Sequence, residues 1–199
     1  MGLELEVKYR ATPAQQEAMR QAFPVQWNML EMETTYYDTP GNTLSGRRFT
    51  LRRRLENGIS ICALKTPGDG FGRGEWEVEA ATIETAIPAL CKLGAPGELE
   101  ELTAAGVISI CGARFTRYAA MVVLEDAEAE LALDSGILFA GKRQTPLCEI
   151  EVEWKCGSQA SVLAFAKGLE EQYSLVLEQD SKFRRALDLR KEAEYGTAE

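Results

Sequence analysis

The sequence has 199 residues, of which 45% are hydrophobic and 27% are charged, and its formal net charge is −9. These values are typical of a globular protein, and the length predicts one domain over residues 1–199. The negative charge argues against a nucleic-acid-binding protein, although a local cluster of cations could still bind an anionic substrate. No run of about 18 apolar residues and no apolar leader are present, so we expect neither a membrane span nor a secretory signal.

The residue types restrict the chemistry further. The five cysteines are odd in number, widely spaced and without a CxxC pair, which predicts free thiols and a cytoplasmic protein. Histidine is absent from the whole sequence. Its absence excludes Ser-His-Asp and Cys-His catalysis and histidine-bound zinc. Acid–base or metal chemistry must therefore use carboxylates, lysines, tyrosines or thiols.

Residues 3–10, LELEVKYR, alternate between apolar and charged side chains and predict a strand. Its apolar face carries Leu3, Leu5, Val7 and Tyr9. Its charged face carries Glu4, Glu6, Lys8 and Arg10. After this strand, Thr12 and Gln15 form a capping-box pattern around Pro13, which predicts a helix over about 13–23.

Turn residues predict the next elements. Residues 36–44, YYDTPGNTL, predict strand, turn and strand, with Pro40-Gly41 as the break. Residues 48–66 predict a hairpin, because Asn57-Gly58 favours a two-residue turn. The glycine-rich residues 67–74 lack the Gly-Lys-Ser/Thr ending of a phosphate-binding P-loop, so we expect a flexible connection instead.

The second half of the chain continues with both element types. Helices are predicted near 83–94 and 98–105, and strands near 75–80, 113–125, 128–134 and 146–155. Ser158 is expected to cap a helix that ends near residue 173. Strands dominate and helices flank them, so the predicted class is α+β, built on a largely antiparallel sheet or barrel.

Several predicted strands place charges of one sign on one face. Glutamates occur at alternate positions in 75–79 and in 149–153, and Arg52 and Arg54 share a face with Thr50. Such faces could simply be solvated. Rows of like charges destabilise a sheet, however, and the opposite faces carry Trp and Ile that helices could cover. This pattern favours a sheet that curls around a charged interior, where carboxylates would bind divalent cations and arginines and lysines would bind phosphate.

Seven landmarks in order give the sequence a family resemblance. They are ExExK at 4–8, YYDTP, LRRR, ALKTP, ALDSG, CEIEVE and SKFRRAL. The chain resembles the CYTH superfamily of triphosphate tunnel metalloenzymes. The resemblance implies an eight-stranded antiparallel β-barrel, or tunnel, with a charged lumen and helices outside. It also implies triphosphate binding with Mg²⁺ or Mn²⁺ in a two-metal mechanism.

The resemblance assigns metal binding to the acidic positions. The implied ligands are Glu4, Glu6, Asp134, Glu149 and Glu151, with Glu153 acting through water. For Asp134 the alternative is an Asx turn before Gly136. A second ion held by Glu6, Asp134 and Glu149 or Glu151 would activate the attacking water.

The resemblance assigns phosphate binding to the basic positions. The implied residues are Lys8, Arg52, Arg54, Lys65, Arg114, Arg117, Lys182 and Arg185. Lys8, Lys65 and Glu6 are implied in catalysis. Lys65 fits phosphate binding less well, because strand alternation places the apolar Ile61 and Ala63 on the same face as Lys65.

Three further assignments leave alternatives open. Arg114 and Arg117 should point to opposite faces of one strand, and we favour Arg114 for the tunnel. Lys182 and Arg185 either close over the tunnel or solvate a helix end. Glu75 and Glu77 are expected to orient the cations rather than to bind metal.

The predicted function is metal-dependent hydrolysis of the terminal phosphate of a small-molecule triphosphate, most simply inorganic tripolyphosphate. The alternatives are a class IV adenylate cyclase that converts ATP to cyclic AMP, a thiamine triphosphatase, and a non-catalytic triphosphate-binding module. A cyclase needs a pocket for the base, which no motif indicates. We expect a monomer or weak homodimer without nucleic-acid or membrane partners.

Overall fold

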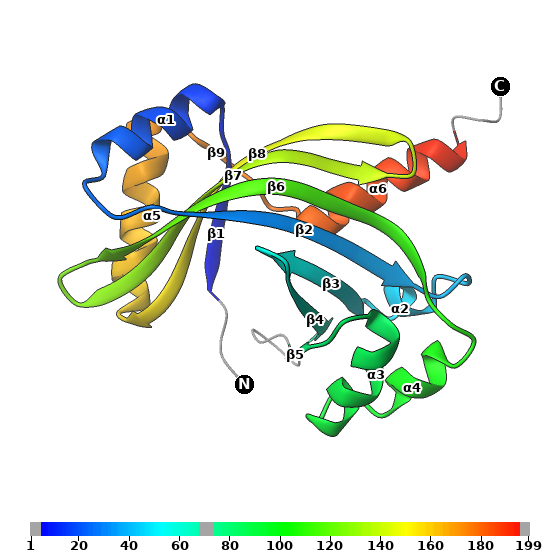
Figure 1. Ribbon diagram of the computed structural model, residues 1–199. Coiled ribbons are helices and arrows are strands. Elements are labelled where there is room, and N and C mark those ends of the chain that lie inside the picture. Colours follow the sequence, from blue (N-terminus) through cyan, green and yellow to red (C-terminus); the bar gives the residue numbers. More distant parts are fainter. Residues whose placement is uncertain (1–4, 68–73, 196–199) are drawn as a thin grey trace.

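The computed structural model describes residues 5–67 and 74–195, with side chains through residue 191. One sheet of nine strands has the order β5-β4-β3-β2-β6-β7-β8-β1-β9, and every pairing in it is antiparallel (Figure 1). The strands are β1 Glu6–Arg10, β2 Asn28–Asp38, β3 Thr50–Glu56, β4 Ile59–Thr66, β5 Gly74–Glu79, β6 Ile108–Val123, β7 Ala127–Ala140, β8 Arg143–Gly157 and β9 Val176–Leu177.

Along the chain, helices lie between the strands and also follow the last strand. They are α1 Pro13–Ala22, α2 Thr43–Gly46, α3 Ile83–Lys92, α4 Glu98–Thr103, α5 Gln159–Tyr173 and α6 Lys182–Tyr195. The predicted α+β class with an antiparallel sheet is confirmed. The sheet has nine strands rather than eight because the two-residue β9 extends it beyond β1. Within the described ranges, no ladder joins β5 to β9, so hydrogen bonds do not close the sheet into a full barrel.

Local sequence signals explain most of the element boundaries. Asn57 and Gly58 form the predicted hairpin turn between β3 and β4, with φ angles of 48° and 86° that favour these two residue types. Thr12 caps α1 in the predicted capping box with Gln15, and Ser158 caps α5. The bounds of α1 and α5 therefore fall close to the predicted ones.

The region after β2 differs from the prediction. The expected strand over the second half of 36–44 is wrong, because a short helix, α2, begins at Thr43. The Asp38 carboxylate accepts hydrogen bonds from the backbone N–H groups of Thr39, Leu44 and Ser45, at 2.7, 2.8 and 3.1 Å. These bonds satisfy amide groups that a second strand would have paired with a neighbour, and they stabilise the turn of helix instead.

Two groups of helices cover the outer face of the sheet. Helices α1 and α5 pack on β1, β7 and β8, where Tyr9 donates a hydrogen bond from its hydroxyl to the Ala166 carbonyl at 3.0 Å. Helices α3 and α4 lie together beside β3, β4 and β5 at the other end of the molecule (Figure 1). The apolar face of the first strand is therefore covered, and its charged face points to the inside of the curved sheet.

Helix α6 has a different position, because it packs on the inner face. Phe183 and Ala186 contact a cluster from β2 and β6 that includes Met32, Tyr36 and Phe115. Figure 1 shows α6 running along β6, β7 and β8 within the curve of the sheet. The first residues of α6 are thus placed against the charged strand faces. Among the described residues, no helix is both long and apolar enough to span a membrane.

Candidate active site

A cavity of about 340 Å³ lies inside the curve of the sheet. Side chains from six strands and from the start of α6 line it. They are Glu6, Lys8, Met32, Thr34, Tyr36, Thr50, Arg52, Arg54, Lys65, Phe115, Arg117, Glu151, Glu153, Ser181, Lys182 and Phe183. Strands β4 and β1 are separated in the sheet by β3, β2, β6, β7 and β8, yet Lys65 and Lys8 line the same cavity. The curvature of the sheet brings these distant strands together.

One wall of the cavity consists of cations from β3 and β4. Arg52 and Arg54 stand two residues apart on β3 and share a face, as their spacing predicts. Lys65 reaches the same wall because it pairs with Thr50 across the β3–β4 ladder. The uncertainty about its face is resolved, since residues paired across a ladder point to the same side.

Acids on β5 contact this cationic wall, as expected from the sequence. Glu75 Oε1 lies 3.1 Å from Lys65 Nζ and 3.4 Å from an Arg52 terminal nitrogen, and Glu77 Oε1 lies 3.2 Å from the same arginine. Glu75 and Glu77 are not among the residues that line the cavity. They hold the cations from the side and leave the cation heads facing the cavity.

The opposite end of the sheet supplies a mixed wall from β1 and β8. Lys8 pairs in register with Glu151, and Glu6 pairs with Glu153. All four line the cavity, and Lys8 Nζ lies 3.3 Å from Glu6 Oε1. The predicted ligand Glu4 lies outside the described residues.

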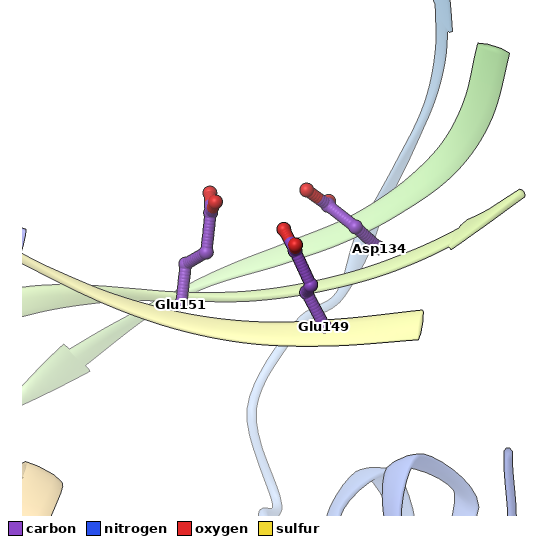
Figure 2. Close-up of side chains that lie close together, drawn as sticks. All are labelled: Asp134, Glu149 and Glu151. Atoms are coloured by element: carbon purple, nitrogen blue, oxygen red, sulfur yellow. The ribbon is translucent and has the colours of Figure 1, made fainter. Parts of the chain in front are cut away.

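Three carboxylates form a buried cluster at the junction of β7 and β8. Asp134, Glu149 and Glu151 rise from the same side of the two strands (Figure 2), and one oxygen atom of each lies within 4.8 Å of the others. Asp134 and Glu149 face each other in the ladder, and Glu151 follows two residues along β8. Asp134 is in the interior of β7, so the Asx-turn alternative is wrong.

Cations from two other elements meet this acidic cluster. Lys182 Nζ lies 2.9 Å from Asp134, 2.6 Å from Glu149 and 2.5 Å from Glu151, measured to a carboxylate oxygen of each. Arg117 donates two hydrogen bonds of 2.7 Å to the two oxygens of Asp134 and one of 2.5 Å to Glu151. The helix-end solvation alternative for Lys182 is therefore wrong.

Glu151 and Lys182 keep their charges through these pairs. Burial favours the neutral form of Glu151, but Lys182 and Arg117 outweigh it and lower the pKa of Glu151 to about 2. Burial likewise opposes the charge on Lys182, but Glu151, Asp134 and Glu149 raise its pKa well above the usual value. The Glu151 carboxylate and the Lys182 ammonium are therefore both ionised at neutral pH.

A second layer of pairs lies behind Glu149. Arg185, one turn along α6, contacts both Glu149 and Glu178, with 3.5 Å to a Glu178 oxygen. Arg10 donates a hydrogen bond of 2.6 Å from Nε to the same buried Glu178. Arg185 thus meets the acids beneath the cavity rather than lining the cavity itself.

Most of the chain matches one known domain family. A model of the CYTH domain matches residues 2–187. The chain belongs to the CYTH domain family. It is similar to an inorganic triphosphatase from Haemophilus influenzae, with 28% identity over 158 residues. The match covers 78% of this chain and 45% of that protein, so the chain spans about half the length of this curated relative.

Solved structures show the same fold. The PH1819 protein from Pyrococcus horikoshii is 21% identical, with a TM-score of 0.60 and coverage of 93% of this chain and 98% of that one. A candidate adenylyl cyclase from Hippeastrum, described as having a dominant triphosphatase activity, is 17% identical with a TM-score of 0.62. That match covers 90% of this chain and 93% of the Hippeastrum chain.

One sequence-based preference in this CYTH chain is wrong. Arg114 points away from the cavity, with 59% of its side chain exposed, and pairs with Glu33 at 3.4 Å. Arg117 lines the cavity, together with Phe115 two residues before it. Strand alternation correctly separates the two arginines, but the choice between faces depends on how β6 pairs with β2 and β7, which the pattern of β6 alone does not determine.

Aromatic and other uncharged residues of the site were not predicted. Tyr36 and Phe183 pack with their rings tilted by 45° and the centroids 4.9 Å apart, and Lys182 Nζ lies 5.3 Å from the centroid of Phe115. Tyr36 belongs to the YYDTP landmark and Phe183 to SKFRRAL. The family resemblance therefore includes both positions, but it assigned no role to either side chain. Their packing holds the first turn of α6, and with it Lys182, against the acids.

The acidic cluster has the donor set for a hard divalent cation. It offers carboxylate oxygens from three residues, which suit Mg²⁺ or Mn²⁺ rather than a metal that prefers nitrogen or sulfur ligands. The same oxygens converge on the Lys182 ammonium, which shows that they can surround one positive centre. The residues present therefore fit the metal that the family resemblance implies.

Proposed function

We propose that this chain is a metal-dependent triphosphatase that removes the terminal phosphate of inorganic tripolyphosphate, yielding diphosphate and phosphate. The cavity lining carries the proposal. It brings together six cations and three acids in a protein whose net charge is −9. The cations are Lys8, Arg52, Arg54, Lys65, Arg117 and Lys182. A cavity with this concentration of cations attracts a small polyanion, whereas the acidic surface around it repels the same polyanion.

The cations would hold the phosphates and stabilise the reaction. Phosphoryl transfer requires little covalent chemistry from a protein, so positioning and charge stabilisation account for most of the catalysis. Arg52 and Arg54 can donate paired hydrogen bonds to phosphate oxygens, and Lys8 and Lys65 approach from β1 and β4, strands next to the two opposite edges of the sheet. Because Glu75 and Glu6 fix the lysine heads before substrate arrives, little rearrangement is needed during transfer.

The acids would hold the metal. We assign this role to Glu6, Asp134, Glu149, Glu151 and, through water, Glu153. We propose that these acids bind two ions. A bound divalent ion would neutralise phosphate charge and lower the pKa of a water molecule. Glu151 and Glu153 line the cavity, while Asp134 and Glu149 lie beneath it, so the protein's carboxylates extend from the buried cluster to the substrate space.

The comparisons support this function without determining the substrate. The Haemophilus relative is an inorganic triphosphatase, and the Hippeastrum structure is associated with triphosphatase activity. A cyclase is the second candidate, because Tyr36, Phe115 and Phe183 give the cavity an aromatic part that could contact a base. Tyr36 and Phe183 already pack on each other, and Lys182 lies against Phe115, which favours the triphosphatase.

Product analysis with several triphosphates tests the proposal. Tripolyphosphate, thiamine triphosphate and ATP would each be incubated with Mg²⁺ and with Mn²⁺, measuring released phosphate and cyclic AMP. We expect the highest kcat/KM for tripolyphosphate and no cyclic AMP. A preference for ATP with cyclic AMP as the product would establish the cyclase instead, and binding without turnover of any substrate would indicate a binding module.

A further inference from the structure

The buried Gln16 side chain joins the two strands that carry the acidic cluster. Its amide nitrogen donates hydrogen bonds to the backbone carbonyls of Asp134 and Glu149, at 3.0 and 2.8 Å. Its amide oxygen accepts a hydrogen bond of 2.5 Å from the Ser135 hydroxyl. Carbonyl oxygens only accept hydrogen bonds, so this orientation of the amide is the one that satisfies all three contacts.

These contacts lie at the register position that defines the cluster. Asp134 and Glu149 are direct partners in the β7–β8 ladder, and Ser135 is the neighbour whose side chain points to the opposite face. Gln16 therefore contacts the backbone of both acids from the outer face while their carboxylates meet on the inner face. A single amide constrains the direction of two carboxylates that come from different strands.

The first turn of α1 brings Gln16 to this position. Strand β1 ends where Arg10 pairs with Glu149, and the N–H of Ala11 donates to the Cys148 carbonyl at 3.0 Å. The capping box at Thr12 then starts α1, and the N–H of Gln16 donates to the Thr12 carbonyl at 3.1 Å. The start of the helix is thus tied to β8 a few residues from Gln16, which leaves the amide little freedom.

We infer that Gln16 is a positioning residue for the metal ligands Asp134 and Glu149, an inference that depends on the proposed function of the acidic cluster. It does not touch substrate or metal. It acts by holding the two backbones at the spacing at which their carboxylates converge. Groups that orient metal ligands from behind commonly change metal affinity about 10–100-fold when they are removed.

The test compares Gln16→Met with Gln21→Met by titration of the metal-free protein with Mn²⁺, monitored by electron paramagnetic resonance. Methionine keeps the length of the side chain and removes the amide. Gln21 is the matched control, because it is an exposed glutamine of the same helix whose amide nitrogen donates to Glu17 at 2.8 Å, away from the acids. We expect Mn²⁺ to bind about 10–100-fold more weakly to Gln16→Met and with parent affinity to Gln21→Met.

The outcomes separate this inference from the function on which it depends. Parent-like Mn²⁺ affinity in folded Gln16→Met would overturn the role of Gln16 and leave the metal site intact. An equal loss in both variants would show a general effect of destabilising α1 and would also overturn it. Absence of Mn²⁺ binding by the parent would overturn the metal site itself and this role with it. If Gln16→Met does not fold, the Ser135→Ala variant is titrated instead, because it removes only the hydrogen bond to the Gln16 amide oxygen. Weaker Mn²⁺ binding by Ser135→Ala supports the inference, and unchanged Mn²⁺ binding overturns it.

Discussion

Lys182 Nζ and Glu149 Oε2 lie 2.6 Å apart, which joins the first residue of α6 to the interior of β8. Glu149 is completely buried, and the Lys182 side chain is only 12% exposed. The same ammonium contacts Asp134 and Glu151. One residue of the C-terminal helix thus neutralises part of the acidic cluster to which we assign metal binding. The stability of the fold is therefore coupled to the charge balance at this proposed metal site.

Replacing this ammonium should destabilise the metal-free protein. Lys182→Met leaves buried carboxylates with one cation fewer, and loss of one partner of a buried ion pair costs about 3–5 kcal/mol. We expect the free energy of unfolding to fall by an amount at the lower end of that range, because Arg117 and Arg185 remain in place. Mn²⁺ should then raise the melting temperature of Lys182→Met more than that of the parent, since the ion replaces the missing charge.

Lys191→Met provides the control for this prediction. Lys191 is on the same helix, half-exposed, and pairs only with Asp188 at 3.6 Å among the contacts described for it. A surface pair of this kind contributes about 0–1 kcal/mol. Urea denaturation of both variants with and without Mn²⁺ measures the difference. Equal stability of Lys182→Met and the parent in metal-free buffer would show that the ammonium is not needed to hold the cluster.

The two arginines of β6 should have very different effects on activity. Arg117 lines the cavity, whereas Arg114 faces outward. A charge-assisted hydrogen bond contributes about 1.5–3 kcal/mol, so Arg117→Met should lower kcat/KM for tripolyphosphate by about 10–100-fold or more. Arg114→Met should stay within about twofold of the parent, because it loses an exposed pair with Glu33 and a contact with the Phe139 ring, both outside the cavity. Steady-state phosphate release tests both, and a larger loss with Arg114→Met would reverse the assignment.

Periodicity alone was sufficient to predict the parts of the site that lie on single strands. Alternation placed Glu6 and Lys8 together, paired Glu149 with Glu151, and separated Arg114 from Arg117. These relationships depend only on the two-residue period of a strand. The turn at Asn57-Gly58 was equally predictable, because its backbone conformation favours those residue types.

Relationships between elements could not be predicted in the same way. The inward face of β6 depends on its register with β2 and β7, and the contact of Gln16 depends on how α1 packs on the sheet. The rows of like charges in the sequence also predicted that the acids of the strand faces repel one another. The structure contradicts this expectation, because Lys182, Arg117 and Arg185 pair with the acids. Nothing in the strand pattern indicated where the C-terminal helix would place its cations.

Activity should depend on a divalent metal bound by the acidic cluster. EDTA should abolish phosphate release, and Mg²⁺ or Mn²⁺ should restore it, because the proposed ligands are all carboxylates. Glu151→Gln should require about 10-fold or more metal for half-maximal activity, since it loses a charged ligand that also lines the cavity. Glu171→Gln, on the exposed side of α5, is the control. If the metal titration of Glu151→Gln superimposes on that of the parent, the ligand assignment is wrong.

Neutralising two acids at once should change both the fold and its response to ligand. In Glu149→Gln with Glu151→Gln, Lys182 keeps only Asp134 of its three charged partners and Arg117 loses Glu151, so the metal-free protein should be less stable than the parent by several kcal/mol. Mn²⁺ with tripolyphosphate should raise the melting temperature of the parent, because a ligand that binds only the folded state stabilises it by mass action. That rise should be absent from the double variant, which lacks two proposed ligands, and present in the control Glu128→Gln with Glu171→Gln, whose acids are exposed. Calorimetric melts of the three proteins decide between two accounts of the charged strand faces. If the acids serve only to pair with α6, the double variant will be destabilised but the parent will not respond to ligand. If they also hold metal beside a bound triphosphate, the parent will show the rise and the double variant will lose it.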